Sequence, residues 1–270
     1  MKITQTISVA AALALTMTMR PASGEDVMPH PGFAEYKTLL KGAVRFNDER
    51  TASEVDYAWL ADRRQDLKGV LEALSGVAQE TYNQWPESAQ LAFLINAYNA
   101  FTLELILTRY PDLESIKDLG SLFRSPWKQE FFTLLGAERS LDEVEHEMIR
   151  GTLAEPRIHA AVNCASCGCP ALLAEPFAAA TLDEQLATAM GGFLADRQRN
   201  YYDTASRRVW VSPIFDWYEE DFAAAEGTLE NYLVTYSDRM GLPPKTPASD
   251  LKVKFTDYDW QLNDLGRCGQ

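Results

Sequence analysis

The longest apolar run in the body of the chain lies at residues 88–110. Apolar residues occur on every side of a helical projection there, a pattern typical of a helix that is buried in a core or spans a membrane. Asn96, Asn99 and Glu104 interrupt the run and favour the core. Asn96 and Asn99 are three residues apart and share one face. Their amides either bind neighbouring backbone or, with Tyr98, line a ligand site.

Shorter amphipathic patterns predict further helices. Residues 53–76 place leucines and a valine at helical spacing after Ser53 and Asp56, which form a capping-box pattern. The same pattern, Ser140 followed by Glu143, predicts a helix over residues 141–153. Residues 181–184 carry it again and predict a helix to residue 194. An aromatic helix is expected over residues 214–222, and its rings, Trp217 and Tyr218 among them, are expected to pack in the core rather than to line a pocket.

Three segments predict β-strands. Residues 157–163 alternate apolar and polar side chains, the period of a strand, and residues 207–213 and 252–260 are rich in β-branched and aromatic residues. The chain has no repeat and no convincing internal linker. We therefore predict one helix-rich α+β domain with a small, largely antiparallel sheet.

One carboxylate stands out in the predicted helix over residues 141–153. Glu145 falls on the same face as Leu141, Val144 and Met148. A carboxylate on an apolar face must be hydrogen-bonded, paired or protonated. We expect Glu145 to be buried, with His159, Arg150 or a backbone N–H as its partner, whereas His146 should lie toward the solvent edge.

The first residues predict export. Lys2 precedes an apolar run, and small residues up to Gly24 separate this run from Glu25, which is the layout of a secretory signal peptide. We expect residues 1–24 to be removed, leaving a domain over residues 25–270 in the periplasm or outside the cell, without stable membrane insertion. The formal charge of −14 becomes −16 without Lys2 and Arg20. Such an acidic chain is a poor partner for nucleic acid.

The cysteines offer the most distinctive chemistry. Cys164, Cys167 and Cys169 lie within six residues, followed by Pro170, and Cys268 is the fourth cysteine. If Pro170 begins a new helix, a thiol at Cys164 would lie near a helix N-terminus and its thiolate would be stabilised. That favours Cys164 as a nucleophile.

A thiol nucleophile needs a base, and two histidines are candidates. His159 lies five residues before Cys164, so on a regular strand the two side chains would point to opposite faces. His159 can serve only if the chain bends near Asn163, and otherwise His146 would be the base. Glu145 would orient the imidazole. Asn163 and Ser166 flank the thiol and are candidate substrate contacts.

Two other interpretations of the cysteines remain. Cys164, Cys167 and Cys169 with His159 would make a soft four-ligand site suited to zinc, but an oxidising compartment favours disulfides over thiolates. We therefore predict neither a metal nor a cofactor. A disulfide, such as Cys164–Cys169 with Cys268 paired to Cys167 or free, would instead be structural or would exchange with thiols.

Five blocks of the chain, taken together, resemble the DUF547 family of proteins of unknown function. They are Phe93-Leu-Ile-Asn-Ala-Tyr-Asn99, Leu141-Asp-Glu-Val-Glu-His146, Arg157 to Pro170, Ser212-Pro-Ile-Phe-Asp-Trp-Tyr218 and Tyr258-Asp-Trp-Gln-Leu-Asn263. The resemblance implies a single, often exported domain with His and Cys in one block. Cys164 and Cys169 match the cysteines of the family pattern, whereas Cys167 does not. A distant likeness to papain-like hydrolase folds is a fold-level analogy.

Two functions follow as expectations. The first is a cysteine-dependent hydrolase or acyltransferase acting on an amide or thioester, with Cys164 and a His/Glu partner. The second is a non-catalytic module that binds a small peptide-like or thiol ligand, with the cysteines in a structural or labile disulfide.

Overall fold

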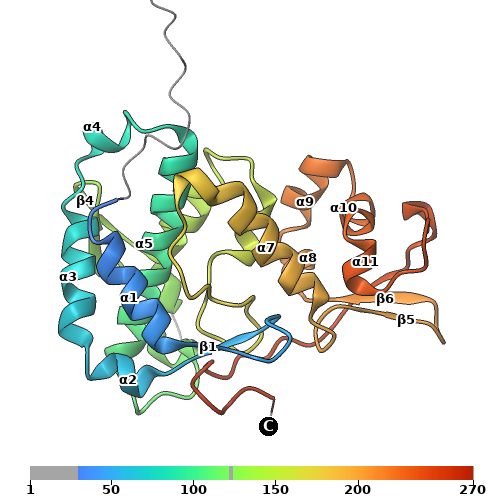
Figure 1. Ribbon diagram of the computed structural model, residues 1–270, viewed down its shortest axis with the longest axis horizontal. Helices are drawn as coiled ribbons and strands as arrows, with labels where there is room; N and C mark the ends of the chain where they lie inside the picture. The colour runs from blue at the N-terminus through green and yellow to red at the C-terminus, as the bar shows by residue number, and fades with distance from the viewer. Residues whose placement is uncertain (1–29, 122–123, 270) are drawn as a thin grey trace, which may run out of the picture.

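The computed structural model describes residues 30–121 and 124–269 (Figure 1). The predicted signal peptide, residues 1–24, lies outside the described residues. The α-helices are α1 (Phe33–Ala43), α2 (Tyr57–Ala61), α3 (Arg64–Ser75), α4 (Gln79–Tyr82), α5 (Glu87–Leu107), α6 (Leu141–Glu143), α7 (Leu182–Ala195), α8 (Ile214–Trp217), α9 (Glu219–Glu226), α10 (Leu229–Thr235) and α11 (Ser237–Met240). The remaining helical segments are η2 (Ile116–Leu119), η3 (Pro126–Lys128), η4 (Val144–Ile149), η5 (Pro156–Ala160), η6 (Ala179–Thr181) and η7 (Ala248–Asp250).

The strands form three small sheets in the described part of the chain. β1 (Val44–Phe46) pairs with β2 (Ser53–Val55), and β3 (Phe132–Leu134) pairs with β4 (Ala137–Arg139), both antiparallel. β5 (Tyr201–Asp203) and β7 (Val253–Phe255) flank β6 (Arg208–Val211), with β5 antiparallel and β7 parallel to it. The predicted α+β class with largely antiparallel pairing is confirmed.

Helix α5 forms the centre of the larger core. It begins after Pro86 and runs to Leu107, and 89% of its most apolar window is buried inside the protein. Its length and composition would also suit a membrane span, but it instead packs against α3, α6, η4 and η6. Fully buried residues such as Phe93, Leu94 and Ile95 each contribute about 1.5–3 kcal/mol through apolar burial.

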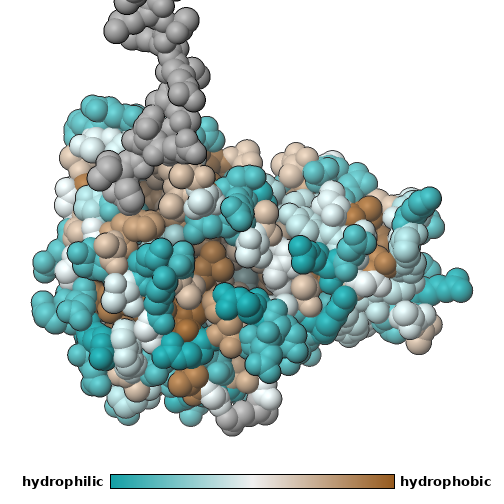
Figure 2. Space-filling view, viewed as in Figure 1, coloured by the Kyte–Doolittle hydropathy of each residue, from teal (hydrophilic) through white to brown (hydrophobic). Residues whose placement is uncertain are grey.

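A second, smaller cluster of buried side chains packs around α7, β6 and α8 to α10. Figure 1 shows α7 between α5 and the helices α8 to α10. Segment η5 joins the two clusters, because Ile158 belongs to the larger cluster and Ala160 to the smaller one. Polar side chains cover most of the face seen in Figure 2, with smaller apolar patches between them.

The N-terminal prediction for residues 53–76 is partly wrong. Residues 53–55 form strand β2, and the helix is broken into α2 and α3. The Asp56 side chain caps α2 by accepting from the Trp59 N–H at 2.9 Å, so Ser53 is not the cap. The predicted helix over residues 181–194 is present as α7, but the Thr181 side chain does not cap it and lies 3.1 Å from Gln185 Oε1.

The predicted helix after Ser140 is confirmed over residues 141–149 with its capping box, but it ends four residues before the predicted end at residue 153. The Ser140 Oγ accepts from the Glu143 N–H at 3.2 Å, and a Glu143 carboxylate oxygen accepts from the Ser140 N–H at 2.8 Å. After α6 the chain widens into the π-helix η4, which ends at Ile149. π-Helical turns are rare and recur at functional sites.

The predicted strand over residues 157–163 is wrong. Pro156 stands at the first position of η5, where its fixed φ favours a helical turn, and the Glu155 carboxylate accepts from the Arg157 N–H at 3.0 Å. Local capping therefore overrides the alternating pattern. Pro170 does not begin a helix either, because residues 170–178 are irregular. The helix N-terminus expected beside Cys164 is absent from this part of the structure.

Candidate functional site

A cavity of about 240 Å³ lies where the two apolar clusters meet. Side chains reach it from segments η4 and η5, the cysteine loop (residues 163–170), α8 and the C-terminal segment (residues 258–269). The lining residues are Tyr98, Ser125, Trp127, Asp142, Glu145, His146, His159, Val162, Cys164, Cys169, Pro170, Ile214, Trp217, Tyr218, Tyr258 and Trp260. It gathers the predicted residues Glu145, His146, His159 and Cys164 in one place.

All four cysteines form disulfides. Cys164 is bonded to Cys169, and Cys167 is bonded to Cys268 across a sequence separation of 101 residues. The sulfurs that would make a zinc site with His159 are therefore engaged in two bridges. Cys164 is half-buried and Cys169 is buried at the cavity wall. In this state Cys164 carries no free thiol.

Polar hydrogens surround the Cys169 sulfur. The Cys164 N–H donates to Cys169 Sγ at 2.9 Å, and the hydroxyls of Tyr258 and Ser166 lie 3.4 and 3.6 Å from it. The same two hydroxyls lie 3.2 and 3.1 Å from Cys164 Sγ. Burial raises the pKa of Tyr258 to about 12, so its hydroxyl keeps its proton.

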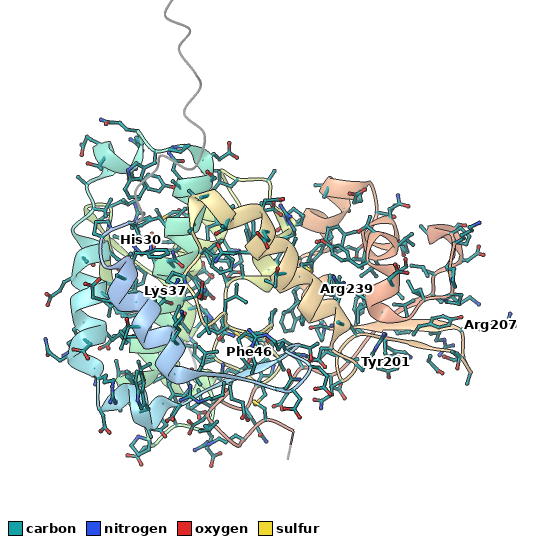
Figure 3. All side chains as sticks on the ribbon, in the orientation of Figure 1. His30, Lys37, Phe46, Tyr201, Arg207 and Arg239 are labelled. Atoms are coloured by element: carbon teal, nitrogen blue, oxygen red, sulfur yellow. A yellow bond between two sulfur atoms is a disulfide. The ribbon has the colours of Figure 1, made fainter. Side chains whose placement is uncertain are left out.

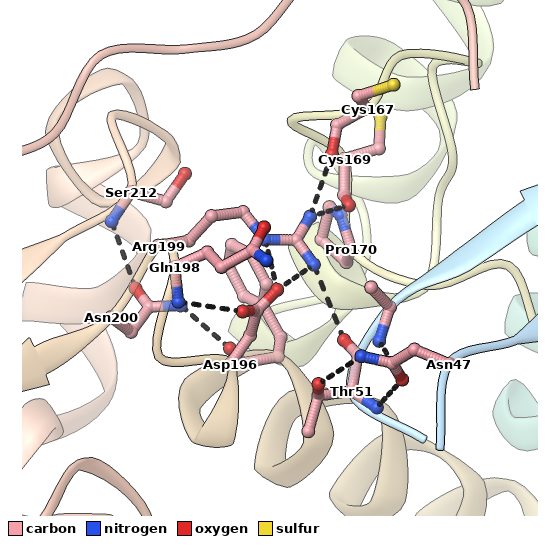
Figure 4. Close-up of polar contacts among 12 residues, drawn as sticks. Asn47, Thr51, Cys167, Cys169, Pro170, Asp196, Gln198, Arg199, Asn200 and Ser212 are labelled. Carbon is pink, nitrogen blue, oxygen red and sulfur yellow. Dashed lines mark hydrogen bonds and ion pairs between the residues drawn. The ribbon is translucent and has the colours of Figure 1, made fainter. Parts of the chain in front are cut away.

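A buried arginine holds the cysteine loop from below (Figure 4). Arg199 is 9% exposed and donates to the carbonyl oxygens of Cys167, at 3.2 Å, and Cys169. Its Nε donates to Asp196 at 2.6 Å, and Nη2 reaches the Thr51 carbonyl at 3.4 Å. The loop is thus fastened to the β1–β2 hairpin and to the end of α7.

His159 is paired with an aspartate that the sequence analysis did not single out. The ring is 2% exposed, and Nε2 lies 2.7 Å from Asp221 Oδ2. Among the described residues, His159 Nδ1 is buried and has no hydrogen-bond partner. Asp221 also accepts from Arg150 at 2.6 and 3.0 Å. Hydrogen bonds from His159 and Arg150 hold the pKa of Asp221 well below its usual value.

The predicted bond between Glu145 and His159 is wrong, although the predicted burial of Glu145 is confirmed. Glu145 is 6% exposed, and its carboxylate accepts from the Tyr218 hydroxyl at 2.6 Å. The Tyr218 ring stacks on His159 with ring centres 3.8 Å apart. Tyr218 thus separates the carboxylate from the imidazole, and Asp221, three residues later on α9, reaches the histidine instead.

Tyr98 is a second tyrosine in the cavity wall whose phenol is affected by Glu145. Burial and the charge of Glu145 hold the pKa of Tyr98 well above its ordinary value, so the phenol stays protonated. His146 is the more open of the two cavity histidines, with 37% of its side chain exposed. Its Nδ1 lies 2.9 Å from Arg150, and its Nε2 lies 3.7 Å from Asp142.

The amides predicted as ligand contacts bind backbone. Asn96 accepts from the Phe177 N–H and donates to the Phe177 carbonyl, both at 2.8 Å, and lies 2.8 Å from His30, labelled in Figure 3. Asn99 accepts from the Asn163 N–H at 2.8 Å and donates to the Ala161 carbonyl. Asn163 in turn donates to the Pro170 carbonyl at 2.8 Å. Asn99 and Asn163 thus fix the path of the cysteine loop, whereas Asn96 fixes the backbone at Phe177.

Several residues of the site come from segments that the sequence analysis assigned to the core or did not single out. Trp217 and Tyr218 were expected to pack in the core, yet Trp217 is 47% exposed and both line the cavity. Asp221 lies in an acidic run, Glu219-Glu220-Asp221, that resembles a solvated helix start. Its spacing of three residues from Tyr218 was the one signal that both side chains share a face.

Protein stability should depend on the protonation of His159. Burial holds the pKa of its imidazole below the ordinary value, so below about pH 6.5 the unfolded chain binds more protons than the folded one. The free energy of unfolding should therefore be highest above pH 6.5. It should decline on acidification by up to about 1.4 kcal/mol per pH unit for this group.

Urea unfolding at pH 5 to 7.5 measures this dependence. His159→Gln should flatten the slope, whereas His146→Gln should leave it in place. Burial also lowers the pKa of His30, so a His30→Asn variant separates the contribution of that residue. A His159→Gln protein with the unchanged wild-type slope would contradict the prediction.

The comparison with known proteins covers three of the five sequence blocks, those at residues 93–99, 141–146 and 157–170. A family model described as "Protein of unknown function, DUF547" matches residues 82–194. The match includes Glu145, His159, Cys164 and Cys169, whereas Tyr218, Asp221 and Tyr258 lie beyond it. No curated protein and no solved structure matches the chain. Residues 82–194 of this chain belong to the DUF547 family.

Proposed function

We propose that the protein, with its Cys164–Cys169 bridge reduced, is a cysteine-dependent hydrolase or acyltransferase acting on an amide or thioester. One observation carries the proposal: Cys164 lines the same cavity as a buried histidine that is hydrogen-bonded to an aspartate. A thiol, an imidazole and a carboxylate that orients the imidazole are the parts of an activated cysteine nucleophile.

The hydrogen bonds indicate which residue does what. Asp221 occupies Nε2 of His159, which leaves Nδ1 to exchange a proton. His146 is a weaker candidate for the base because its Nδ1 is held by Arg150. Glu145 is not the orienting acid, because its carboxylate is held by Tyr218.

The reaction would proceed in two steps after an external thiol or dithiol has reduced the bridge. Cys164 loses its proton to His159, and its thiolate attacks the acyl carbon. The bond to the leaving amine or thiol breaks, and that group takes the proton from His159. Water, or an amine or thiol acceptor, then attacks the thioester, His159 takes its proton, and Cys164 is released.

A non-catalytic binding module is the second candidate, and the disulfides favour it. Every cysteine is bridged, so the oxidised protein offers no thiol nucleophile, while the cavity can still hold a small peptide-like or thiol ligand. We also propose export directed by residues 1–24, since an oxidising compartment supports both bridges.

Acyl transfer to Cys164 is the direct test. The reduced protein is incubated with a small acyl thioester, quenched in acid and analysed by intact mass and peptide mapping. We expect one added acyl group on Cys164 and none on the oxidised protein. The double variant Cys167→Ser/Cys268→Ser is the control and should still be acylated. If acylation is absent, or spreads evenly over the cysteines of the reduced protein, the binding module becomes the better description.

A further inference from the structure

The Glu145 carboxylate lines the cavity without a cationic partner. It is 6% exposed, and it accepts a hydrogen bond from the neutral hydroxyl of Tyr218 at 2.6 Å. Among the ion pairs of the described residues none includes Glu145, and the nearby Arg150 is bound to Asp221. A buried charge is costly unless an opposite charge compensates it. Its position at the cavity wall allows a ligand to supply that charge.

An aromatic wall forms another part of the same cavity. The rings of Trp217 and Trp260 are stacked with centres 5.7 Å apart, and Tyr258 lies 4.9 and 4.4 Å from them. Trp127 meets Trp260 edge to face at 5.9 Å. Trp217 is 47% exposed, unusually open for so large an apolar side chain. An open indole beside a cavity offers a face on which a ligand can stack.

Two cations of the protein already use aromatic faces around this cavity. Lys117 Nζ lies 3.5 Å from the centre of the Trp260 ring, and the Arg150 guanidinium lies 4.9 Å from that of Tyr218. Cations are attracted to the faces of tryptophan and tyrosine rings, and the attraction is stronger where water is excluded. The lining itself contains two carboxylates, Asp142 and Glu145, and neither lysine nor arginine.

We propose that this cavity binds a ligand through an ammonium group, either a primary amine or a quaternary ammonium. The Glu145 carboxylate supplies the counter-charge, and the aromatic wall formed by Trp217, Tyr258 and Trp260 contacts the alkyl part. That this ligand is the substrate rests on the proposed function, in which it would be an amide or thioester carrying a cationic amine. Binding itself needs no free thiol.

Matched pairs of cationic and neutral probes test the proposal on the oxidised, full-length protein. Choline is compared with its uncharged isostere 3,3-dimethyl-1-butanol, and n-butylammonium with n-butanol, by tryptophan fluorescence and calorimetry. We expect each cation to bind about tenfold or more tightly than its neutral partner, as for a desolvated cation on aromatic rings. Glu145→Gln should remove most of that preference.

Two variants keep the test interpretable. Glu147→Gln makes the same charge change on the exposed side of η4 and should leave the preference intact. Trp217→Leu changes a half-exposed side chain without opening the core, and it should weaken binding of both cations. Equal affinity for charged and neutral probes, or a preference that survives Glu145→Gln, would overturn the proposal.

The proposed function fails separately. Because these measurements use the bridged protein, they do not depend on Cys164 chemistry. Absence of acylation together with cation-selective binding would leave an ammonium-binding module. Acylation without cation selectivity would keep the catalyst and refute the ammonium site.

Discussion

Replacing both Cys167 and Cys268 by serine should lower the free energy of unfolding by about 4–5 kcal/mol, in line with a cross-link that closes a loop of ~100 residues. The bridge joins residues that are 101 positions apart. It ties the C-terminal segment to the cysteine loop, where the Cys167 N–H also donates to the Gln261 carbonyl at 2.8 Å. Losing it mainly frees the unfolded chain, so the folded state should keep its secondary structure.

The short bridge is the matched control. Cys164 and Cys169 are five residues apart, and closing so short a loop restricts the unfolded chain by only about 2 kcal/mol. Urea titrations of both serine pairs, monitored by circular dichroism, give the two losses. Equal losses, or a larger loss for Cys164→Ser/Cys169→Ser, would show that loop closure does not decide the stability of this protein.

The parts of the fold that could be predicted are those where side-chain pattern and burial coincide. Helix α5 is apolar on every side because it is buried on every side, so periodicity identifies it directly. The Ser140 capping box is equally local, since Ser140 and Glu143 need only each other. Glu145 follows from the phase of that helix, and its burial was predicted correctly.

The parts that could not be predicted depend on contacts between distant residues. His159 and Asp221 are 62 positions apart, and no local pattern marks Asp221 among its acidic neighbours. The alternation at residues 157–163 resembled a strand because alternate apolar residues pack into two different clusters. Ile158 and Val162 lie in the larger cluster, and Ala160 lies in the smaller one. Tyr218 was assigned to the core from its aromatic character alone, yet its hydroxyl and its ring serve two different partners, Glu145 and His159.

The arrangement around Tyr218 separates two tasks that the sequence analysis had combined in one triad. Glu145 lies among phenols and faces the cavity, where it can meet a ligand. Asp221 lies between Arg150 and His159, where it sets the orientation of the imidazole. Removing the charge of each carboxylate should therefore produce a different defect. Glu145→Gln should lose cation selectivity, and Asp221→Asn should lose turnover.

Asp221→Asn should reduce turnover of an acyl thioester by the reduced protein by about 10²–10⁴-fold, the range expected when general acid–base catalysis is lost. An amide at position 221 can still bond to the ring, but it cannot stabilise an imidazolium, and it favours the wrong tautomer. The substitution also removes the counter-charge of Arg150. Substrate binding should change less than turnover, because Asp221 does not line the cavity.

Three companion measurements make this result specific. Cys164→Ser sets the rate without the nucleophile, and Asp221→Asn should lie at or above that rate. Glu220→Gln, an exposed neighbour on α9, makes the same charge change and should keep wild-type turnover. The pH profile of the remaining activity in Asp221→Asn should also shift, because the carboxylate stabilises the protonated ring and its loss lowers the pKa of His159. Wild-type turnover in folded Asp221→Asn would remove the His159–Asp221 pair from the mechanism, since a purely structural pair would alter stability and leave the rate and its pH dependence unchanged.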